Sequence, residues 1–296
     1  MNIGLYDVDS HNWPNLALMK ISAYHKARGD TVEFWNGLKH YDIVYKSRIF
    51  DDTYTQDLEY SINADCIIKG GTGYDLNNKL PYEIEHQRPD YALYGIKNKA
   101  FGHTTRGCPR NCPFCIVTQK EGAKVETVAD LGEFWSGERE IVLMDSNLTA
   151  SKDCERIFND LIRSGARVNF VGGLDIRLLT DKGAEQLNHI KTSAIYFAWD
   201  NYEFQTYDQL KRFRPLIKKR GRDIGVYVLT NYNTTIEQDL ERIYKLKELD
   251  YTPYVMIYDK PNAPAKVKKL QRWCNNRVIF QTVNNFDDYG KTQKEG

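Results

Sequence analysis

Hydrophobic and polar positions in the first third of the chain follow two alternating periods. Ile3 to Val8 alternates apolar with small or polar residues and predicts a strand, and Asn15 to Arg28 carries apolar residues at helical spacing up to Gly29. Three more short apolar runs predict strands at Thr31 to Trp35, Tyr41 to Tyr45 and Ala64 to Ile68. Strands and helices alternating at this spacing are typical of an α/β fold with a doubly wound parallel sheet.

A second series of alternating elements begins near residue 99, after a segment from Leu80 to Gly95 that has turn residues and no clear period. Six strands are predicted, at Phe101 to Thr105, Glu140 to Met144, Arg167 to Val171, Ala194 to Trp199, Ile224 to Leu229 and Thr252 to Ile257. Five helices are predicted between them, at Glu126 to Trp135, Asp153 to Arg163, Asp181 to Ile190, Tyr207 to Lys219 and Thr235 to Leu249. We therefore predict two domains, residues 1–98 and 99–296.

Composition and charge indicate an ordinary globular protein. Of the 296 residues 41% are hydrophobic and 27% are charged, and the formal net charge of +1 favours neither nucleic acid nor acidic partners. No run approaches the roughly 18 apolar residues of a spanning helix, and the first nine residues carry acids where a signal peptide carries bases. We expect a cytoplasmic protein without a membrane partner.

One basic run bears on the choice of partner. Residues 211–222 hold seven bases and no acid, with Phe213 among them, as a nucleic-acid groove can. The run falls on a predicted outer helix, far in sequence from the strand ends. We interpret it as a solvated face and keep nucleic acid as an open alternative.

Three cysteines lie within eight residues, at Cys108, Cys112 and Cys115, with the spacing C-x3-C-x2-C. Pro109, Pro113 and the preceding glycine favour a loop, which could turn the three thiols toward one centre. Thiolates select iron–sulfur clusters, zinc or copper(I). Three ligands leave one iron of a [4Fe-4S] cluster open, whereas a structural zinc site takes four ligands, for which His103 is the candidate.

The remaining cysteines, Cys66, Cys154 and Cys274, are single residues within predicted strands or helices. We expect them to be buried thiols, which fits a reducing compartment.

The cysteine loop, with the aromatic residue Phe114 directly before its last cysteine, resembles the signature of radical S-adenosylmethionine (SAM) enzymes. The wider segment from Gly102 to Val117 is similar to the subgroup that carries a cobalamin-binding-like domain ahead of the barrel. The resemblance implies a partial (β/α)6 TIM-type barrel, a [4Fe-4S] cluster held by the three cysteines and reductive cleavage of SAM to a radical. It also implies an electron donor such as flavodoxin or ferredoxin, and a substrate that the sequence does not identify.

The resemblance also assigns SAM contacts to residues at predicted strand ends, where barrels hold their functional groups. It gives the SAM amino group to Asp145 or Asn147 and the ribose hydroxyls to Asp200, while Phe114 belongs to the signature itself. Arg177 could hold the SAM carboxylate or an anionic substrate. Tyr227, or alternatively the backbone near Tyr254 and Ile257, would flank the adenine. The alternatives are helix capping at Ser146 or Asn147, an ion pair of Arg177 with Asp175, and core packing for any one tyrosine.

The first domain resembles the opening of a cobalamin-binding-like domain in Trp13 to Leu18 and Gly29 to Val32. In the motif D-x-H-x-x-G, Asp9 and His11 match, but Pro14 replaces the glycine. We expect a degenerate domain that shapes the substrate pocket. A cobalamin-dependent radical SAM methyltransferase is one alternative function, and a non-enzymatic zinc protein is another.

Overall fold

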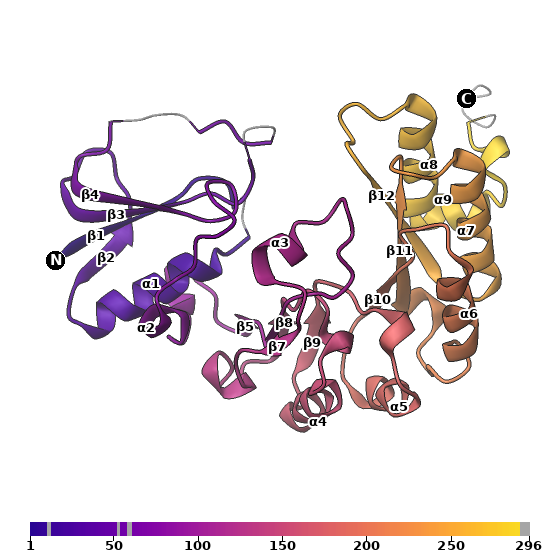
Figure 1. The fold of residues 1–296 in the computed structure, drawn as a ribbon, viewed down its shortest axis with the longest axis horizontal. Helices are drawn as coiled ribbons and strands as arrows, with labels where there is room; N and C mark the ends of the chain where they lie inside the picture. Colours follow the sequence, from indigo (N-terminus) through magenta and orange to yellow (C-terminus); the bar gives the residue numbers. More distant parts are fainter. Residues whose placement is uncertain (11–12, 52–53, 58–60, 291–296) are drawn as a thin grey trace. The chain divides into compact units, whose positions relative to one another are not determined.

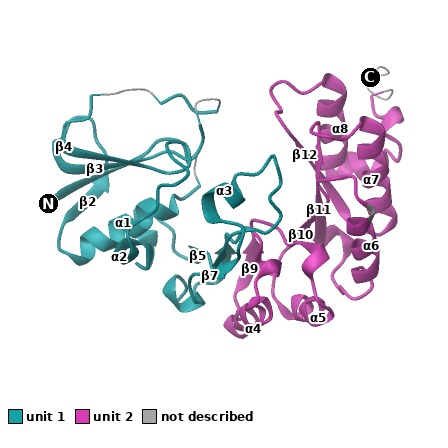
Figure 2. Cartoon of the chain, in the orientation of Figure 1, with its two compact units in different colours: residues 1–146 teal, residues 147–296 magenta. Residues whose placement is uncertain are grey.

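The structure is a computed structural model, which describes residues 1–10, 13–51, 54–57 and 61–290. The chain has a mixed α/β fold with parallel sheets and divides into two compact units, Met1–Ser146 and Asn147–Gly296 (Figure 2). Each unit is described by itself. The predicted boundary between residues 98 and 99 stays a prediction.

The first sheet confirms the predicted parallel strands of the N-terminal region. Its order is β2-β1-β3-β4, and every pairing is parallel. The strands are β1 (Asn2–Asp7), β2 (Thr31–Phe34), β3 (Tyr41–Ser47) and β4 (Ala64–Gly70). Helix α1 (Leu16–Ala27) connects β1 to β2, whereas the described parts of the next two connections contain no helix (Figure 1). A buried core of Ile3, Leu5, Leu18, Ile21 and Ile84 joins this sheet to its helices.

The segment from Leu80 to Gly95, which has no clear sequence period, forms two short helices, α2 (Tyr82–Glu85) and the 3-10 helix η1 (Tyr91–Tyr94). Tyr91 is buried, and its hydroxyl accepts a hydrogen bond from Phe101 N at 2.9 Å and lies 2.7 Å from Phe134 O. The Tyr91 side chain therefore fixes this segment to the next strand. The sequence, which has no clear period here, did not indicate this contact.

The rest of the first unit has one parallel and one antiparallel strand pair. Strands β5 (Lys99–Gly102) and β8 (Glu140–Leu143) pair in parallel, and β6 (Thr105–Arg106) pairs antiparallel with β7 (Glu126–Thr127). Between β6 and β7 lie the cysteines and the short helix α3 (Val117–Glu121).

The predicted helix from Glu126 to Trp135 is wrong. Its first residues form β7, and only the 3-10 helix η2 (Leu131–Glu133) follows. Two features explain the difference. The β-branched Thr127 pairs with Thr105 across the hairpin, and Gly132 weakens a helix at the centre of the predicted span.

The second unit contains the remaining predicted strands. Strands β10 (Ile195–Ala198), β11 (Ile224–Thr230) and β12 (Thr252–Ile257) form a parallel sheet in that order, and β9 (Arg167–Phe170) adjoins β10 through a parallel bridge from Val168 to Thr192. Helices α6 (Phe204–Phe213), α7 (Ile236–Glu248) and α8 (Ala265–Asn275) lie on one side of the β10–β12 sheet (Figure 1). All six predicted strands therefore exist, and their closure into a barrel stays a prediction.

Four predicted helices are confirmed, as α4 (Cys154–Ser164), α5 (Asp181–His189), α6 and α7. Helix α7 begins where Thr235 accepts a hydrogen bond from Gln238 N at 3.3 Å and the Gln238 side chain accepts one from Thr235 N at 3.0 Å, which is a capping box. Helix α6 ends at Phe213, six residues before its predicted end, because Pro215 cannot donate a helical hydrogen bond.

No bounds of helices or strands were predicted for the chain after Ile257, which forms helices α8 and α9 (Arg277–Thr282). Trp273 is fully buried there against Phe280 and Phe286. Short 3-10 helices complete the unit, namely η3 (Leu148–Ala150), η4 (Ile176–Leu178), η5 (Gly221–Asp223) and η6 (Phe286–Asp288).

The basic run of residues 211–222 pairs with acids of the same unit. Arg212 lies 2.8 Å from Asp181, and Arg214 forms an ion pair with Asp250. Phe213 is fully buried, so its ring belongs to the core and does not face solvent with the bases. Among the described residues, no helix has the length and apolar character needed to cross a membrane.

Candidate metal centre and strand-end residues

The three clustered cysteines lie on the loop between β6 and β7 in the first unit. Cys108 and Cys112 are partly buried, Cys115 is exposed, and all six cysteines of the chain are thiols. The backbone N–H of Cys115 donates to Cys112 O at 2.9 Å. A bond of this kind closes a four-residue turn, which keeps the two Cα atoms within about 7 Å of each other. Phe114 lies inside this turn.

The base of the loop is closed by backbone contacts. Cys108 N donates to Gly122 O at 3.1 Å, and the Thr118 hydroxyl donates to Cys108 O at 3.2 Å. Gly107 has a φ of +101°, and a Cβ atom there would lie 2.1 Å from the carbonyl oxygen of Lys124. Only glycine fits this position, so the chain enters the cysteine loop along a fixed path.

Glu121 is a residue of this loop base that the sequence reasoning missed. Its carboxylate accepts hydrogen bonds from Gly107 N at 3.0 Å and from the Ser146 hydroxyl at 2.9 Å, and it forms an ion pair with Arg106 at 3.1 Å. The Glu121 side chain, at the end of α3, thus links the start of the loop to the residues that follow β8. The partners Gly107 and Ser146 lie 14 and 25 residues away in sequence, so no short stretch of the chain indicates these contacts.

Asp145, predicted to hold the SAM amino group, is buried beside the same loop. Its carboxylate accepts four hydrogen bonds, from the backbone N–H and the hydroxyl of both Thr104 and Thr105. Burial raises the pKa of Asp145, and these four bonds act against that rise. Three of these bonds go to Oδ1 and one to Oδ2, so Asp145 holds the strand that leads to Gly107. Its predicted contact with the SAM amino group stays a prediction.

His103, the candidate fourth zinc ligand, precedes that strand. Its Nδ1 atom is buried and has no hydrogen-bond partner. Burial holds the pKa of His103 well below its usual value, and the nearby cations Arg106, Lys20 and Lys120 lower it further. The imidazole is therefore neutral at neutral pH.

The residues of the loop fit an iron–sulfur cluster in their chemistry. Three thiols come from one loop whose two ends are anchored, and no fourth cysteine lies near them in sequence. Across the described residues, no group of three or more His, Cys, Asp or Glu side chains is gathered closely enough to hold a metal ion. Ligation would therefore require residues 108–115 to close around the metal, and their partial or full exposure leaves room for that movement.

In the second unit, Arg177 forms the ion pair that the sequence left as an alternative. Its guanidinium donates to both carboxylate oxygens of Asp175, at 2.8 and 3.1 Å, and lies 3.8 Å from Glu203. The bidentate pair orients Arg177 and uses two of its donor groups. Its predicted contact with the SAM carboxylate stays a prediction.

Asp200, at the end of β10, lies among the charges of this group. Burial raises the pKa of Asp200 to about 6, against the lowering effect of Arg242 and Arg177, and Asp175 adds to the rise. The carboxyl group therefore titrates near neutral pH. A group of this kind at the carboxyl end of a parallel strand is a candidate for binding or proton transfer.

Arg242 of α7 is the main charged group that lowers the pKa of Asp200, and the sequence did not indicate this role. It is fully buried, and it donates to the carbonyl oxygens of Trp199 and of Leu229, the latter at 2.7 Å, and to Asp239 at 2.6 Å. These carbonyls lie at the ends of β10 and β11, so one arginine ties the two strand ends to the helix.

The other residues of this unit that were predicted to contact SAM lie in three separate places. The Asn147 side chain accepts a hydrogen bond from Thr149 at 3.2 Å, and Thr149 in turn accepts one from Asp175 N. Tyr227 stacks on Tyr196 with centroids 4.8 Å apart and meets the Tyr254 ring edge-on at 5.8 Å. Ile257 instead packs against the buried cluster around Trp273, on the helix side of the sheet. The rings of Tyr227 and Tyr254 therefore lie in contact, whereas the Ile257 side chain lies elsewhere.

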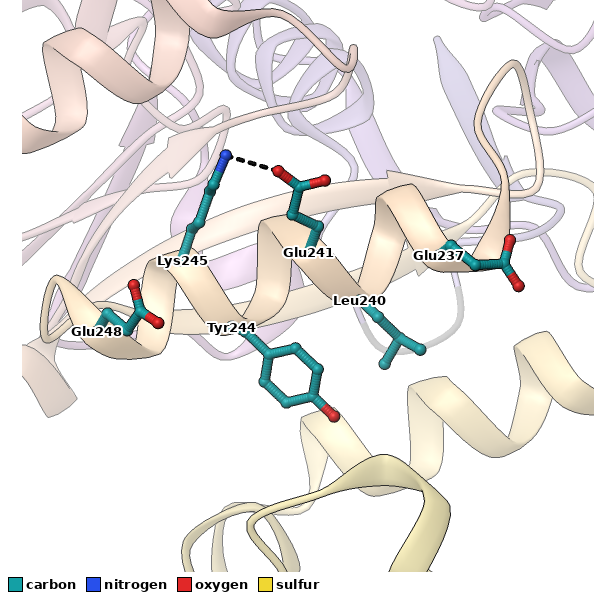
Figure 3. A pocket seen from close by; sticks show the side chains of 6 residues that line it. All are labelled: Glu237, Leu240, Glu241, Tyr244, Lys245 and Glu248. Carbon is teal, nitrogen blue, oxygen red and sulfur yellow. Dashed lines mark ion pairs between the residues drawn. The ribbon is translucent and has the colours of Figure 1, made fainter.

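A hollow on the outer surface of α7 does not coincide with any predicted contact. It has a volume of about 460 Å³. Figure 3 shows the side chains that line it, and the ion pair of Lys245 with Glu241 at 2.6 Å. The lining residues are Glu237, Leu240, Glu241, Tyr244, Lys245 and Glu248. These residues belong to one helix face, so the hollow is a shallow surface feature of α7.

Comparisons with known proteins give a limited result. No protein family model matches the chain, and no curated protein matches it. A crystal structure of SuiB from Streptococcus suis, bound to the precursor peptide SuiA, aligns with 67% of this chain at 12% sequence identity and a TM-score of 0.41. The alignment covers 47% of the SuiB chain, so the match spans about half the length of that protein. A likeness of this degree assigns no function.

Proposed function

We propose that this protein is a radical SAM enzyme, which holds a [4Fe-4S] cluster with Cys108, Cys112 and Cys115. The observation that carries the proposal is the C-x3-C-x2-C motif on a loop whose base is fixed by Gly107, Glu121 and Asp145. A loop anchored in this way lets the thiols close on a metal without disturbing the sheet behind it.

When bound, such a cluster leaves one iron open to the amino and carboxylate groups of SAM and supplies the electron that cleaves it. The protein binds, orients and excludes water. We assign the ribose hydroxyls to Asp200 and the adenine to the stacked Tyr227. For the SAM amino group we keep Asp145 and Asn147 as the two candidates, because an ammonium group needs oxygen acceptors.

We also propose that residues 1–98 support the cysteine loop and do not bind cobalamin. Glu85 forms ion pairs with Lys20 of α1 at 2.8 Å and with Arg106 of β6 at 3.4 Å, which couples the first sheet to the loop base. At the carboxyl ends of β1 and β3, the usual ligand position of such sheets, the Asp9 carboxylate accepts bonds from Ile49 N and Phe50 N. The chain thus fills this position with its own groups. His11, the predicted cobalamin ligand, lies outside the described residues.

The proposal is tested by anaerobic reconstitution with iron and sulfide. We expect brown protein with about four irons and four sulfides per chain. Cys108→Ala, Cys112→Ala and Cys115→Ala should each lose the cluster. Cys66→Ser is the matched control, because Cys66 is exposed on β4 and its replacement removes a thiol without opening a cavity.

Two outcomes would overturn the proposal in different ways. Colourless protein with one zinc per chain, lost in His103→Ala, would indicate a structural zinc site. A chain that binds hydroxocobalamin in addition to iron would support the methyltransferase alternative.

A further inference from the structure

Strand β4 forms the outer edge of the first sheet and is exposed on both of its faces. The sheet order β2-β1-β3-β4 leaves it with β3 as its neighbour. Ile67 and Ile68 are 43% and 42% exposed, and Cys66 is exposed as well, so the prediction of a buried thiol at position 66 is wrong. The seven residues of β4 thus present apolar side chains to solvent at a sheet edge. Natural proteins usually protect such an edge.

The backbone of β4 offers hydrogen-bonding groups at this edge. Arg48 N bonds to Gly70 O just after the end of β3, and the parallel register pairs Tyr45 with Ile68 and Lys46 with Lys69. In a parallel ladder, alternate residues of a strand bond to the same neighbour. The even-numbered residues of β4 therefore bond to β3, and the N–H and C=O groups of Asp65 and Ile67 point outward, as does the carbonyl of Lys69, which accepts a bond from the Asn78 side chain.

The sequence of this strand, Ala-Asp-Cys-Ile-Ile-Lys-Gly, complements itself when read in the opposite direction about Ile67. In an antiparallel pair of two copies, the outward backbone groups of Ile67 would bond to those of Ile67 in the other copy, and those of Asp65 to those of Lys69. Asp65 would lie opposite Lys69, and Ile67 would lie opposite Ile67. Apolar residues thus face apolar residues and the two charges are opposite, which is a favourable cross-strand arrangement.

We propose that β4 pairs antiparallel with β4 of a second copy of this chain, with the two-fold axis at Ile67. Such an interface is isologous, since the same patch of both copies meets itself. Asp65 is 68% exposed and contacts His40 at 3.0 Å, which leaves its carboxylate open to a second cation. An eight-stranded sheet across two chains would result, with no free edge at β4.

This interface is small. A stable interface takes roughly 20–30 residues from each partner, and β4 supplies seven. We therefore expect a dimer that forms at high protein concentration and dissociates on dilution. The proposal does not depend on the cysteine loop and holds whether or not the chain binds a cluster.

Crosslinking tests the register. In the Cys66→Ser/Ile67→Cys variant, the two thiols at position 67 face each other as a hydrogen-bonded pair, whose Cα separation of about 5.5 Å lies within the range for a disulfide. Mild oxidation should convert most of the full-length protein to a covalent dimer on a non-reducing gel. The matched control is Cys66→Ser/Ile68→Cys, in which the thiol at position 68 faces position 66 of the other copy, where no thiol remains, and should not crosslink.

A charge exchange tests the pairing independently of any thiol. Asp65→Lys places like charges opposite each other twice in the dimer, and we expect the dimer dissociation constant to rise about tenfold in sedimentation equilibrium. Asp65→Lys/Lys69→Asp should restore it, although it also lacks the His40 contact. The proposal is overturned if the protein is monomeric at all concentrations, if both cysteine variants crosslink equally, or if the double exchange does not restore the dimer.

Discussion

The base of the cysteine loop and the strand-end group of the second unit both use buried acids, but with different partners. At the loop base, Asp145 accepts hydrogen bonds from backbone and hydroxyl donors. At the strand ends, Asp175 and Asp239 are paired with Arg177 and Arg242. Neutral donors fix the position of a chain segment, whereas charged partners also set the protonation state of the groups around them.

This difference indicates a division of tasks. The first unit holds a loop in place and leaves its thiols accessible. The second unit builds a charged environment in which the Asp200 carboxyl group has a pKa of about 6. The loop base should therefore respond to changes of backbone geometry, and the strand ends to changes of charge and pH.

The largest expected effect is at the charged strand ends. Arg242→Ala removes the charged partner of the buried Asp239 and the donor to two strand-end carbonyls, and we expect a loss of about 3–5 kcal/mol in the free energy of unfolding. Urea unfolding measures it. The matched control is Lys245→Ala on the exposed side of the same helix, where loss of the pair with Glu241 should cost about 0.5 kcal/mol or less. Equal losses in the two variants would contradict the account.

The next effect concerns pH. Because burial raises the pKa of Asp200 to about 6, the folded protein keeps this proton to higher pH than the unfolded chain does. Asp200 therefore contributes a stability that is lost as pH rises from about 4 to about 6. Asp200→Asn mimics the protonated form. The free energy of unfolding of this variant minus that of the wild type should therefore be larger at pH 7.5 than at pH 4, by on the order of 2–3 kcal/mol. A difference between variant and wild type that is the same at both pH values would show that Asp200 has an ordinary pKa.

A smaller and more local effect is expected at the loop base. Gly107→Ala places a Cβ against the carbonyl of Lys124, so the loop must shift. We expect a loss of about 1–2 kcal/mol in stability and a large loss of iron uptake on reconstitution. Gly122→Ala is the matched control, since its φ is +93° but nothing lies within 4 Å of the added atom. Equal iron uptake by both variants would show that the fixed path at Gly107 is not needed for the metal.

The sequence predicted the elements whose signal is local. The strands of both units and helix α7 follow from apolar period and capping, and the cysteine spacing identified the loop. The residues that fix the sites act over long separations, as Asp145 does on Thr104 and Arg242 on Trp199. No short window contains such pairs, so their roles appear only in the structure. Helix α8, by contrast, could have been predicted from the sequence, because its buried residues follow a helical period. They are Val267, Leu270, Trp273 and Cys274.

Reductive cleavage of SAM tests the central claim most directly. Reconstituted wild-type protein, reduced and given SAM without any substrate, should slowly form 5'-deoxyadenosine and methionine in equal amounts. Cys112→Ala should form neither, and Cys66→Ser should match the wild type. If the wild-type protein holds an intact cluster and yields no methionine, or if Cys112→Ala yields as much as the wild type, the radical SAM assignment is contradicted.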